Sequence, residues 1–259
     1  LTKALDNGLA RTPAMGWNPH NKVNGNFNES YVKATIDAIV ENGLDKLGYI
    51  YINLDDGWQA KNRSENGSLV ADSTKFPSGI KSLADYAHQK GLKFGIYSGA
   101  STITSKELPG SLGHETEDAK LFAEWECDYL KYDYHADGSN VPVPERDVLM
   151  GTALNATGRP MYYSNSGGGF TLPYLWGPKV LNSWRVTLDI KDRWSAIAEI
   201  AEVMTAISHY GAPGGWNDAD MLEVGIGGLT LAEEKSHFAL WAFWKSNLLL
   251  ANDIPNIDK

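Results

Sequence analysis

The stretch D-Y-L-K-Y-D at residues 128–133 decides the fold. Its aromatic and apolar residues predict a short buried strand, and Lys131 and Asp133 lie two positions apart, so that both point to the same face of that strand. A charged group buried on such a face is costly unless it is paired. The sequence therefore predicts that the end of this strand has a chemical task that needs a carboxylate and an ammonium group.

The same kind of run recurs on both sides of residues 128–133. Strand-like runs alternate with helical patterns of amphipathic residues along the whole chain. The further strands are predicted at 13–18, 49–56, 93–98, 160–165, 179–186, within 208–221, and at 246–253. The helical patterns lie at 29–43, 79–91, 116–126, 146–158, 193–208 and 232–245. Eight strands with seven intervening helices are typical of a parallel α/β barrel.

The predicted fold is therefore a (β/α)8 TIM barrel that occupies residues 1–259 as one catalytic domain. An open doubly wound sheet is the alternative. It is disfavoured because no G-x-G-x-x-G motif follows the first predicted strand.

Composition and charge limit the partners. The chain has 259 residues, a net charge of −9 and no basic stripe, which disfavours nucleic acid and anionic membrane surfaces. No stretch approaches the ~18 apolar residues of a membrane span. Cys127 is the only cysteine, so we interpret it as a buried thiol. A neutral small molecule is the expected partner.

Four N-glycosylation sequons suggest passage through a secretory route, at Asn28, Asn62, Asn66 and Asn155. The lack of cysteines is a weak argument for the cytosol. We expect a secreted, extracellular glycoprotein, with a lysosome or vacuole as the other compatible location.

Polar side chains gather where the predicted strands end. They include Asp55, Asp56, Tyr97, Lys131, Asp133, Asn165, Ser166, Trp184, Arg185, Asp189, Trp216, Asn217, Asp218 and Asp220. In a barrel these strand ends converge on one rim, where active sites are built. The pattern predicts a cup of carboxylates with aromatic walls, which suits the hydroxyls and the apolar face of a sugar.

Each of these residues also has a simpler explanation. Asp in a strand-to-helix loop is commonly a helix cap, and Asp218 and Asp220 fit that interpretation best. For Trp17, Trp58, Trp184 and Trp216, core packing is at least as probable as ligand stacking. Only His20 and His135 lie where barrel metal sites place histidines, so no metal and no other cofactor is expected.

Several motifs in one order resemble glycoside hydrolase family 27, the melibiase or α-galactosidase family. They are TPAMGWN from residue 12, LDDGW from 54, LADYAHQKGLKFGIYS from 83, the segment 108–133, NSWRV with Asp189, and WNDADMLEVG from 216 followed by HFALWAFWKSNLL. The resemblance covers essentially the whole chain. It implies a barrel without cofactor that hydrolyses terminal α-galactosides with retention of configuration.

The resemblance also implies roles for individual residues. Asp133 matches the nucleophile and Asp189 the general acid/base; for retention their carboxyl groups should lie about 5–5.5 Å apart. We expect Lys131 to keep the pKa of Asp133 low, whereas Asp189 should begin protonated. Residues that match the sugar pocket are Trp17, Asp55, Asp56, Tyr97, Lys131, Ser166, Arg185, Asp220 and Met221.

Departures from the family pattern leave the substrate open. Cysteines of the family are replaced by Gly57, Ser105, His135 and Asn165, and a pocket tryptophan is replaced by His20. The loop 165–170 reads NSGGGF, and its small residues would leave room beside the sugar C2. An α-N-acetylgalactosaminidase or β-L-arabinopyranosidase of the same family, or a non-catalytic carbohydrate-binding barrel, are therefore the alternatives.

The family usually carries a β-sandwich domain after the barrel. This sequence ends at NDIPNIDK, just beyond the eighth predicted strand. The expectation is a barrel that lacks its last helix and the β-sandwich, or one whose remaining part is carried by a separate chain.

Overall fold

The structure, a computed structural model, describes residues 7–257. Eight short strands form one parallel sheet in the order β7-β6-β5-β4-β3-β2-β1-β8. Their bounds are Met15–Trp17 (β1), Tyr51–Asn53 (β2), Lys93–Gly99 (β3), Tyr129–Asp133 (β4), Tyr162–Asn165 (β5), Ser183–Arg185 (β6), Trp216–Asp218 (β7) and Leu248–Leu250 (β8). Each lies inside or within one residue of a predicted run.

The sheet curls so that its first-listed and last-listed strands, β7 and β8, come together. Here the contact is not a regular ladder but a single parallel bridge between Leu222 and Leu250, with the Leu222 amide donating to the Leu249 carbonyl at 2.9 Å. The Asn247 side chain also donates to Asp218 at 3.3 Å. The seam therefore closes the predicted (β/α)8 barrel, and the fold prediction is confirmed.

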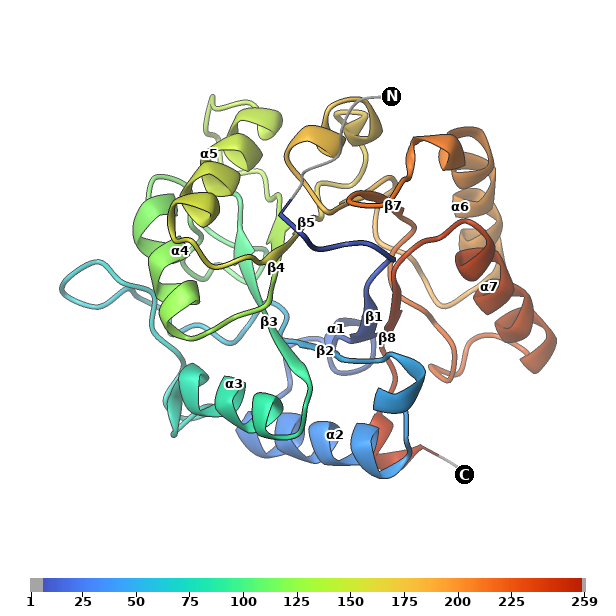
Figure 1. The fold of residues 1–259 in the computed structure, drawn as a ribbon, viewed down its shortest axis with the longest axis horizontal. Helices are drawn as coiled ribbons and strands as arrows, with labels where there is room; N and C mark the ends of the chain where they lie inside the picture. Colours follow the sequence, from blue (N-terminus) through green and yellow to red (C-terminus); the bar gives the residue numbers. More distant parts are fainter. Residues whose placement is uncertain (1–6, 258–259) are drawn as a thin grey trace.

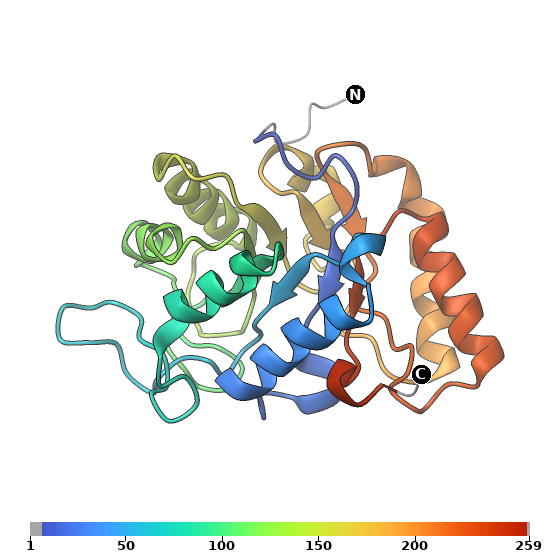
Figure 2. The same cartoon turned by 60° about the horizontal axis from the view of Figure 1, so that its bottom comes forward.

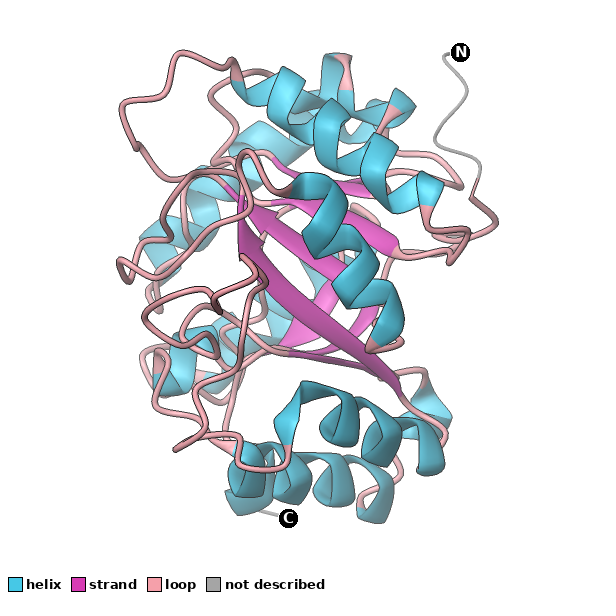
Figure 3. Cartoon of the chain, turned by 90° about the vertical axis from the view of Figure 1, so that its left-hand side faces the viewer, coloured by secondary structure: helices cyan, strands magenta, loops and turns pink. Residues whose placement is uncertain are grey.

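Helices surround the strands, as Figures 1 and 3 show. They are α1 (His20–Val23), α2 (Glu29–Glu41), α3 (Gly79–Gln89), α4 (Glu115–Glu124), α5 (Val143–Ala156), α6 (Trp194–Ile207) and α7 (Leu231–Phe243). Asn28 caps α2 by accepting from the Tyr31 amide, and Thr230 and Glu233 form a capping box on α7. The six predicted helical patterns are confirmed as α2 to α7.

One expected helix is absent from the described residues. Between β5 and β6 the chain makes only two 3₁₀ turns, Pro173–Leu175 and Gly177–Lys179, so the prediction of seven intervening helices is wrong there. The segment contains Pro173, Gly177 and Pro178, and proline and glycine disfavour the interior of an α-helix. The crossover at this point therefore presents turns instead of a covering helix.

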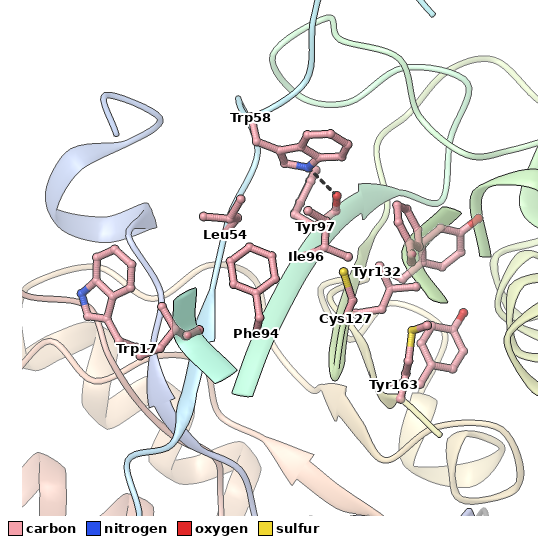
Figure 4. Close-up of a cluster of buried hydrophobic side chains, with 14 of the residues drawn as sticks. Trp17, Leu54, Trp58, Phe94, Ile96, Tyr97, Cys127, Tyr132 and Tyr163 are labelled. Atoms are coloured by element: carbon pink, nitrogen blue, oxygen red, sulfur yellow. Dashed lines mark hydrogen bonds between the residues drawn. The ribbon is translucent and has the colours of Figure 1, made fainter. Parts of the chain in front are cut away.

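The two faces of the sheet carry different cores. The inner cluster of Tyr51, Tyr129, Tyr162 and Trp216 lies at the first residues of their strands and closes the amino end of the barrel; Tyr129 and Tyr162 stack at 4.9 Å. Between strands and helices lies the larger core, part of which Figure 4 shows. Cys127 lies in this larger core, fully buried, as predicted. The amino end is thus sealed, and the opposite end carries the polar groups.

Candidate active site

The alternating side chains of β4 point in turn to the outer core and to the inside of the barrel. Leu130 and Tyr132 belong to the outer core, whereas Tyr129 belongs to the inner aromatic cluster. Lys131 and Asp133 follow Tyr129 on the inner face at two-residue steps and line a cavity of about 380 Å³. The prediction that these two side chains share one face is therefore confirmed.

The cavity collects residues from strands and loops at the carboxyl end of the barrel. Among the predicted site residues, the structure places Asp55, Lys131, Asp133, Ser166 and Asp189 in its lining. The other lining residues are His20, Ser105, Tyr134, His135, Gly167, Gly168, Phe170, Leu188 and Lys191. Asp133 at the end of β4 and Asp189 in the loop after β6 thus face one cavity, as a two-carboxylate glycosidase mechanism requires.

Asp55 and Lys131 form a tight ion pair in the wall. The Lys131 ammonium donates to Asp55 Oδ2 at 2.6 Å, and Asn18 donates to the same oxygen at 2.8 Å. Burial opposes ionisation of Asp55, but the charge of Lys131 and the hydrogen bond and charge of His20, whose Nδ1 lies 3.2 Å away, lower its pKa well below the usual value. Asp55 is therefore an ionised hydrogen-bond acceptor that Lys131 and Asn18 hold in place.

Asp56 is held by the loop after β3. Ser105 donates to Asp56 Oδ2 at 2.9 Å and the Lys106 amide donates at 3.1 Å, while Asp56 Oδ1 is buried with no hydrogen-bond partner among the described residues. Burial raises the pKa of Asp56. An orphaned buried acceptor next to Asp55 suits a ligand hydroxyl.

Asp133 accepts a hydrogen bond from an aromatic hydroxyl group. Tyr97 donates to Asp133 Oδ2 at 2.9 Å, and the Lys131 ammonium lies 5.6 Å from the centre of the Tyr97 ring. Burial raises the pKa of Asp133 to about 6, although Lys131 and the Tyr97 hydrogen bond act in the opposite direction. The expectation of a low pKa for Asp133 is therefore wrong, because burial outweighs Lys131, whose ammonium donates to Asp55.

Asp189 shows the opposite behaviour. Its side chain is 62% exposed and accepts from Arg185 Nη2 at 2.9 Å. Burial of its inner part raises the pKa, but the charge and hydrogen bond of Arg185, with Lys131 and His20, lower it below the usual value. The expectation that Asp189 begins protonated is also wrong for this state of the protein, since the Arg185 ion pair favours the carboxylate.

Arg185 links the two sides of the site. It also pairs with Asp220 Oδ2 at 2.8 Å and donates to the Ser166 hydroxyl at 3.3 Å. With Asp220 and Met221 it borders a smaller cavity of about 20 Å³, which shares Lys131 and Ser166 with the larger one. The predicted far wall therefore lies at the base of the same cup.

The cap interpretation of Asp218 and Asp220 is wrong. Thr230 caps α7, whereas Asp218 Oδ1 accepts from the Asp220 amide at 2.9 Å and Asp220 Oδ2 from the Ile190 amide at 2.8 Å. Asp220 also has a left-handed backbone with φ of 77°. Asp218 therefore fixes the turn that carries Asp220, and Asp220 fastens the loop that carries Asp189 and pairs with Arg185 at the end of β6.

Three predicted pocket residues, Trp17, Asp56 and Tyr97, line neither cavity. Tyr97 still contacts Asp133 and Asp56 directly follows Asp55, whereas Trp17 points away from the site. Its side chain is fully buried and packs in the outer core (Figure 4), and its indole donates to the Asn252 carbonyl at 3.0 Å. This agrees with the packing explanation, which the sequence left open.

The site contains residues that motif matching passed over. Phe170 and Leu188 are 71% and 64% exposed although both line the cavity. The available signal was their position: a large apolar residue directly after the glycine run, and another directly before Asp189. His20, which the sequence offers as a possible metal-ligating histidine and as a departure from the family pattern, contacts Asp55 in the wall.

One group of side chains has the spacing of a metal site, and it lies outside the cup. Among residues 7–257, the one group of three side chains spaced for a metal ion is Asp85, His88 and Glu126, outside the cavity lining. Lys81 already pairs with Asp85 and with Glu126 there.

Comparison with known proteins agrees with this geometry. The family model described as alpha galactosidase A matches residues 12–259. An α-galactosidase of Cyamopsis tetragonoloba is 50% identical over 254 residues, which cover 98% of this chain and 62% of that protein. One of Coffea arabica is 51% identical over 255 residues, covering 98% of this chain and 67% of that protein.

Solved structures agree as well. Alpha-galactosidase I of Mortierella vinacea superposes with a TM-score of 0.95 at 41% identity, covering 98% of this chain and 70% of that one. The enzyme of Saccharomyces cerevisiae gives 0.95 at 38% identity, covering 100% and 62%. This chain spans less than two thirds of the first curated relative. With eight strands, the two aspartates and the family model in agreement, the chain belongs to the melibiase family, glycoside hydrolase family 27.

Proposed function

We propose that this chain is the catalytic domain of a retaining, exo-acting α-galactosidase, and that its partners are α-galactoside oligosaccharides or glycoconjugates. The observation that carries the proposal is that Asp133 and Asp189 face one cavity whose wall holds Asp55, Lys131 and Ser166. A non-catalytic carbohydrate-binding barrel would not need two carboxylates facing one sugar cavity.

In the first step Asp133 attacks the anomeric carbon while Asp189 gives its proton to the glycosidic oxygen, so that the bond to the leaving group breaks. In the second step Asp189 takes a proton from water, which displaces Asp133 and releases α-galactose. Asp55 and Asp56 accept hydrogen bonds from the hydroxyls at C4 and C6, and Lys131 donates beside Asp133. Arg185 and Ser166 lie on the C2 side, and Tyr97, Asp220 and Met221 complete the base.

The protonation states of Asp133 and Asp189 in the free site are the reverse of those that the reaction needs, so substrate binding must exchange them. In the free site the last proton belongs to Asp133, since burial raises its pKa to about 6, and Asp189 is ionised beside Arg185. When Arg185 donates to a sugar hydroxyl instead, Asp189 loses part of what favours its carboxylate. The proton then moves to the acid and leaves Asp133 charged for attack.

The test is a panel of aryl α-galactoside, α-glucoside and α-N-acetylgalactosaminide with β-L-arabinopyranoside. We expect the galactoside to be turned over fastest and the glucoside poorly, because we assign Asp55 and Asp56 as the acceptors of an axial hydroxyl at C4. Equal turnover of the glucoside would contradict this. Wild-type hydrolysis should release α-galactose first, and first release of β-galactose would refute retention.

Ser166 favours a secondary activity. Its side chain is small, lines the cavity and accepts from Arg185. We therefore expect slow acceptance of the N-acetylgalactosaminide, and no detectable binding of N-acetylgalactosamine would exclude it. The relatives above are named α-galactosidases, which places this activity second.

We also propose that the protein is secreted or directed to a lysosome or vacuole, and is glycosylated. Asn28, Asn62, Asn66 and Asn155 are all exposed. Asn62 and Asn66 lie in the loop between the bridged residues Gln59 and Ala71, which projects in Figure 2. Within residues 7–257, no helix is long and apolar enough to cross a membrane. Digestion with peptide:N-glycosidase should increase the mobility of the native protein on a gel, whereas unchanged mobility would count against glycosylation.

A further inference from the structure

A fully buried carboxyl group lies outside the cup, on the helix that follows β4. Asp147 is completely buried on α5, and it lines neither of the two cavities at the carboxyl end of the barrel. Among residues 7–257, no lysine, arginine or histidine forms an ion pair with it, and the neighbouring Arg146 pairs with Asp137 instead. A buried carboxyl group without a cationic partner is costly, so its remaining contacts need an explanation.

The remaining polar contacts of Asp147 are hydrogen bonds from β5. Its Oδ2 accepts from Asn165 Nδ2 at 2.8 Å, and its Oδ1 accepts from the Tyr163 hydroxyl at 3.2 Å. Burial raises the pKa of Asp147 to about 7, whereas these two hydrogen bonds and the charge of Arg146 act to lower it. The neutral carboxyl group keeps both contacts, because the Tyr163 hydroxyl can accept a proton from Oδ1 while Oδ2 still accepts from Asn165.

Asn165 connects Asp147 to the loop after β5. Its side chain is buried, and its Oδ1 accepts from the Gly167 amide at 2.9 Å. A Cβ atom added to Gly167 would lie 3.2 Å from the same oxygen, so the loop and the side chain are closely packed. Because Asp147 Oδ2 accepts, the amino group of Asn165 faces α5 and its oxygen faces the loop. In the reversed orientation, the amino group of Asn165 would meet the Gly167 amide, and two donors would face each other.

The loop that Asn165 fixes forms part of the cavity wall. Its residues in the lining are Ser166, Gly167, Gly168 and Phe170. The Ser166 hydroxyl also accepts from Arg185 at 3.3 Å. Two hydrogen bonds in series, from Asn165 to Asp147 and from Gly167 to Asn165, therefore connect a buried group on α5 with the wall of the cavity.

We propose that Asp147 is a positioning residue for the sugar pocket, which acts through Asn165 to hold the loop 165–170 in the conformation that binds substrate. The inference rests on the proposed glycosidase function, and it adds a residue that lies outside the cavity. Loss of Asp147 should weaken substrate binding more than it slows the chemical steps, because Asp133 and Asp189 belong to β4 and to the loop after β6.

The test compares a variant that keeps the acceptor for Asn165 with one that lacks it. Asp147→Leu leaves Asn165 Nδ2 buried without an acceptor, so KM for an aryl α-galactoside should rise about 3- to 10-fold while kcat stays within about twofold. Asp147→Asn should keep the KM of the wild-type protein, because its oxygen accepts from Asn165 and its amino group donates to the Tyr163 hydroxyl. If Asp147→Leu does not fold, Asp147→Ala, which also lacks the acceptor, takes its place.

The matched control is Met150→Ala, which truncates a fully buried residue of the same helix in the outer core. It should lower Tm, as a core truncation does, without changing KM. An unchanged KM after Asp147→Leu, or an equal rise in KM after Met150→Ala, would show that Asp147 only fills the core. Failure of Asp147→Asn to keep the wild-type KM would show that the acceptor for Asn165 is not what matters. Each of these results overturns the proposal.

Hydrogen exchange of the Gly167 amide gives a readout that does not depend on catalysis. This amide donates to Asn165 Oδ1, so Asp147→Leu should speed its exchange by about 10-fold, whereas Asp147→Asn and Met150→Ala should not. Unchanged exchange in Asp147→Leu would overturn the proposal. If the exchange responds as expected but the wild-type protein hydrolyses no α-galactoside, the proposed function is refuted and the hold of Asp147 on the loop is supported.

Discussion

Replacing the candidate nucleophile should make the protein more stable while it abolishes activity. Asp133→Asn keeps the shape of the side chain and an oxygen that accepts from Tyr97, but it removes a charge that the site disfavours. Burial raises the pKa of Asp133 to about 6 from 3.8, so the folded protein binds this proton more tightly than the unfolded chain does. Such a group contributes stability below pH 3.8 that is lost as the pH rises through about 6.

The size of the effect follows from the same values. A difference of 2.2 pH units corresponds to about 3 kcal/mol at 1.36 kcal/mol per unit, which is the upper limit above pH 6. Asp133 is half-buried and borders an open cavity, so solvent reduces the penalty. We expect Asp133→Asn to raise the free energy of unfolding at pH 7 by about 1–2 kcal/mol, or roughly 2–8 °C in Tm.

Urea unfolding of both proteins between pH 3.5 and 7.5 measures this difference, with galactoside hydrolysis as the activity readout. The increase in the free energy of unfolding caused by Asp133→Asn should be near zero at pH 3.5 and should grow as the pH rises through 6. Asp189→Asn is the matched control, because the pKa of Asp189 is lowered and its charge is favoured. A gain that is independent of pH, or a less stable Asp133→Asn protein at pH 7, would refute the reasoning.

Three further predictions concern catalysis. The pH profile of kcat/KM should have an acidic optimum and fall above about 6, where the pair of Asp133 and Asp189 loses its last proton; a plateau to pH 8 would contradict this. Asp189→Asn should fail on raffinose but still react with dinitrophenyl α-galactoside, and azide should then release α-galactosyl azide; rescue of Asp133→Asn to an α product would reverse the assignment. Asn165→Ala should raise KM for raffinose about 3- to 10-fold, because it frees the loop 165–170 from Asp147. The change in Tm should be smaller than that of a core truncation. An unchanged KM would show that the bond between Asn165 and Asp147 is dispensable.

The sequence predicted side-chain positions correctly where they depend on the alternation of residues along a strand. The two-residue spacing of Lys131 and Asp133 predicted a common face, and both line the cavity. Glycine after a helical pattern marked its end, as at Gly43 and Gly91, which have φ of 71° and 77°. Local patterns of this kind depend on few neighbours, and so they can be read from the chain alone.

The sequence was not informative about quantities set by distant neighbours. Lys131 points to the predicted face of β4, but its ammonium binds Asp55, which follows β2, and not Asp133. The pKa values of Asp133 and Asp189 therefore differ in the opposite order from the one expected. Trp17 shares its motif with pocket residues, yet its ring turns to the outer core. The exposed Phe170 depends on a contact between Gly169 and Val186, from two separate loops.

The pleat of β4 sets the spacing of the side chains that line the cup. Strand residues rise about 3.3 Å each, so the Cα atoms of Tyr129, Lys131 and Asp133 follow one another at steps of about 6.6 Å along the strand. The stacked tyrosines form a fixed floor, because Tyr129 and Tyr162 lie 4.9 Å apart and neither is free to move aside. A cup that is closed at the amino end of the barrel supports the exo action proposed above, because a substrate can enter it only from the carboxyl end.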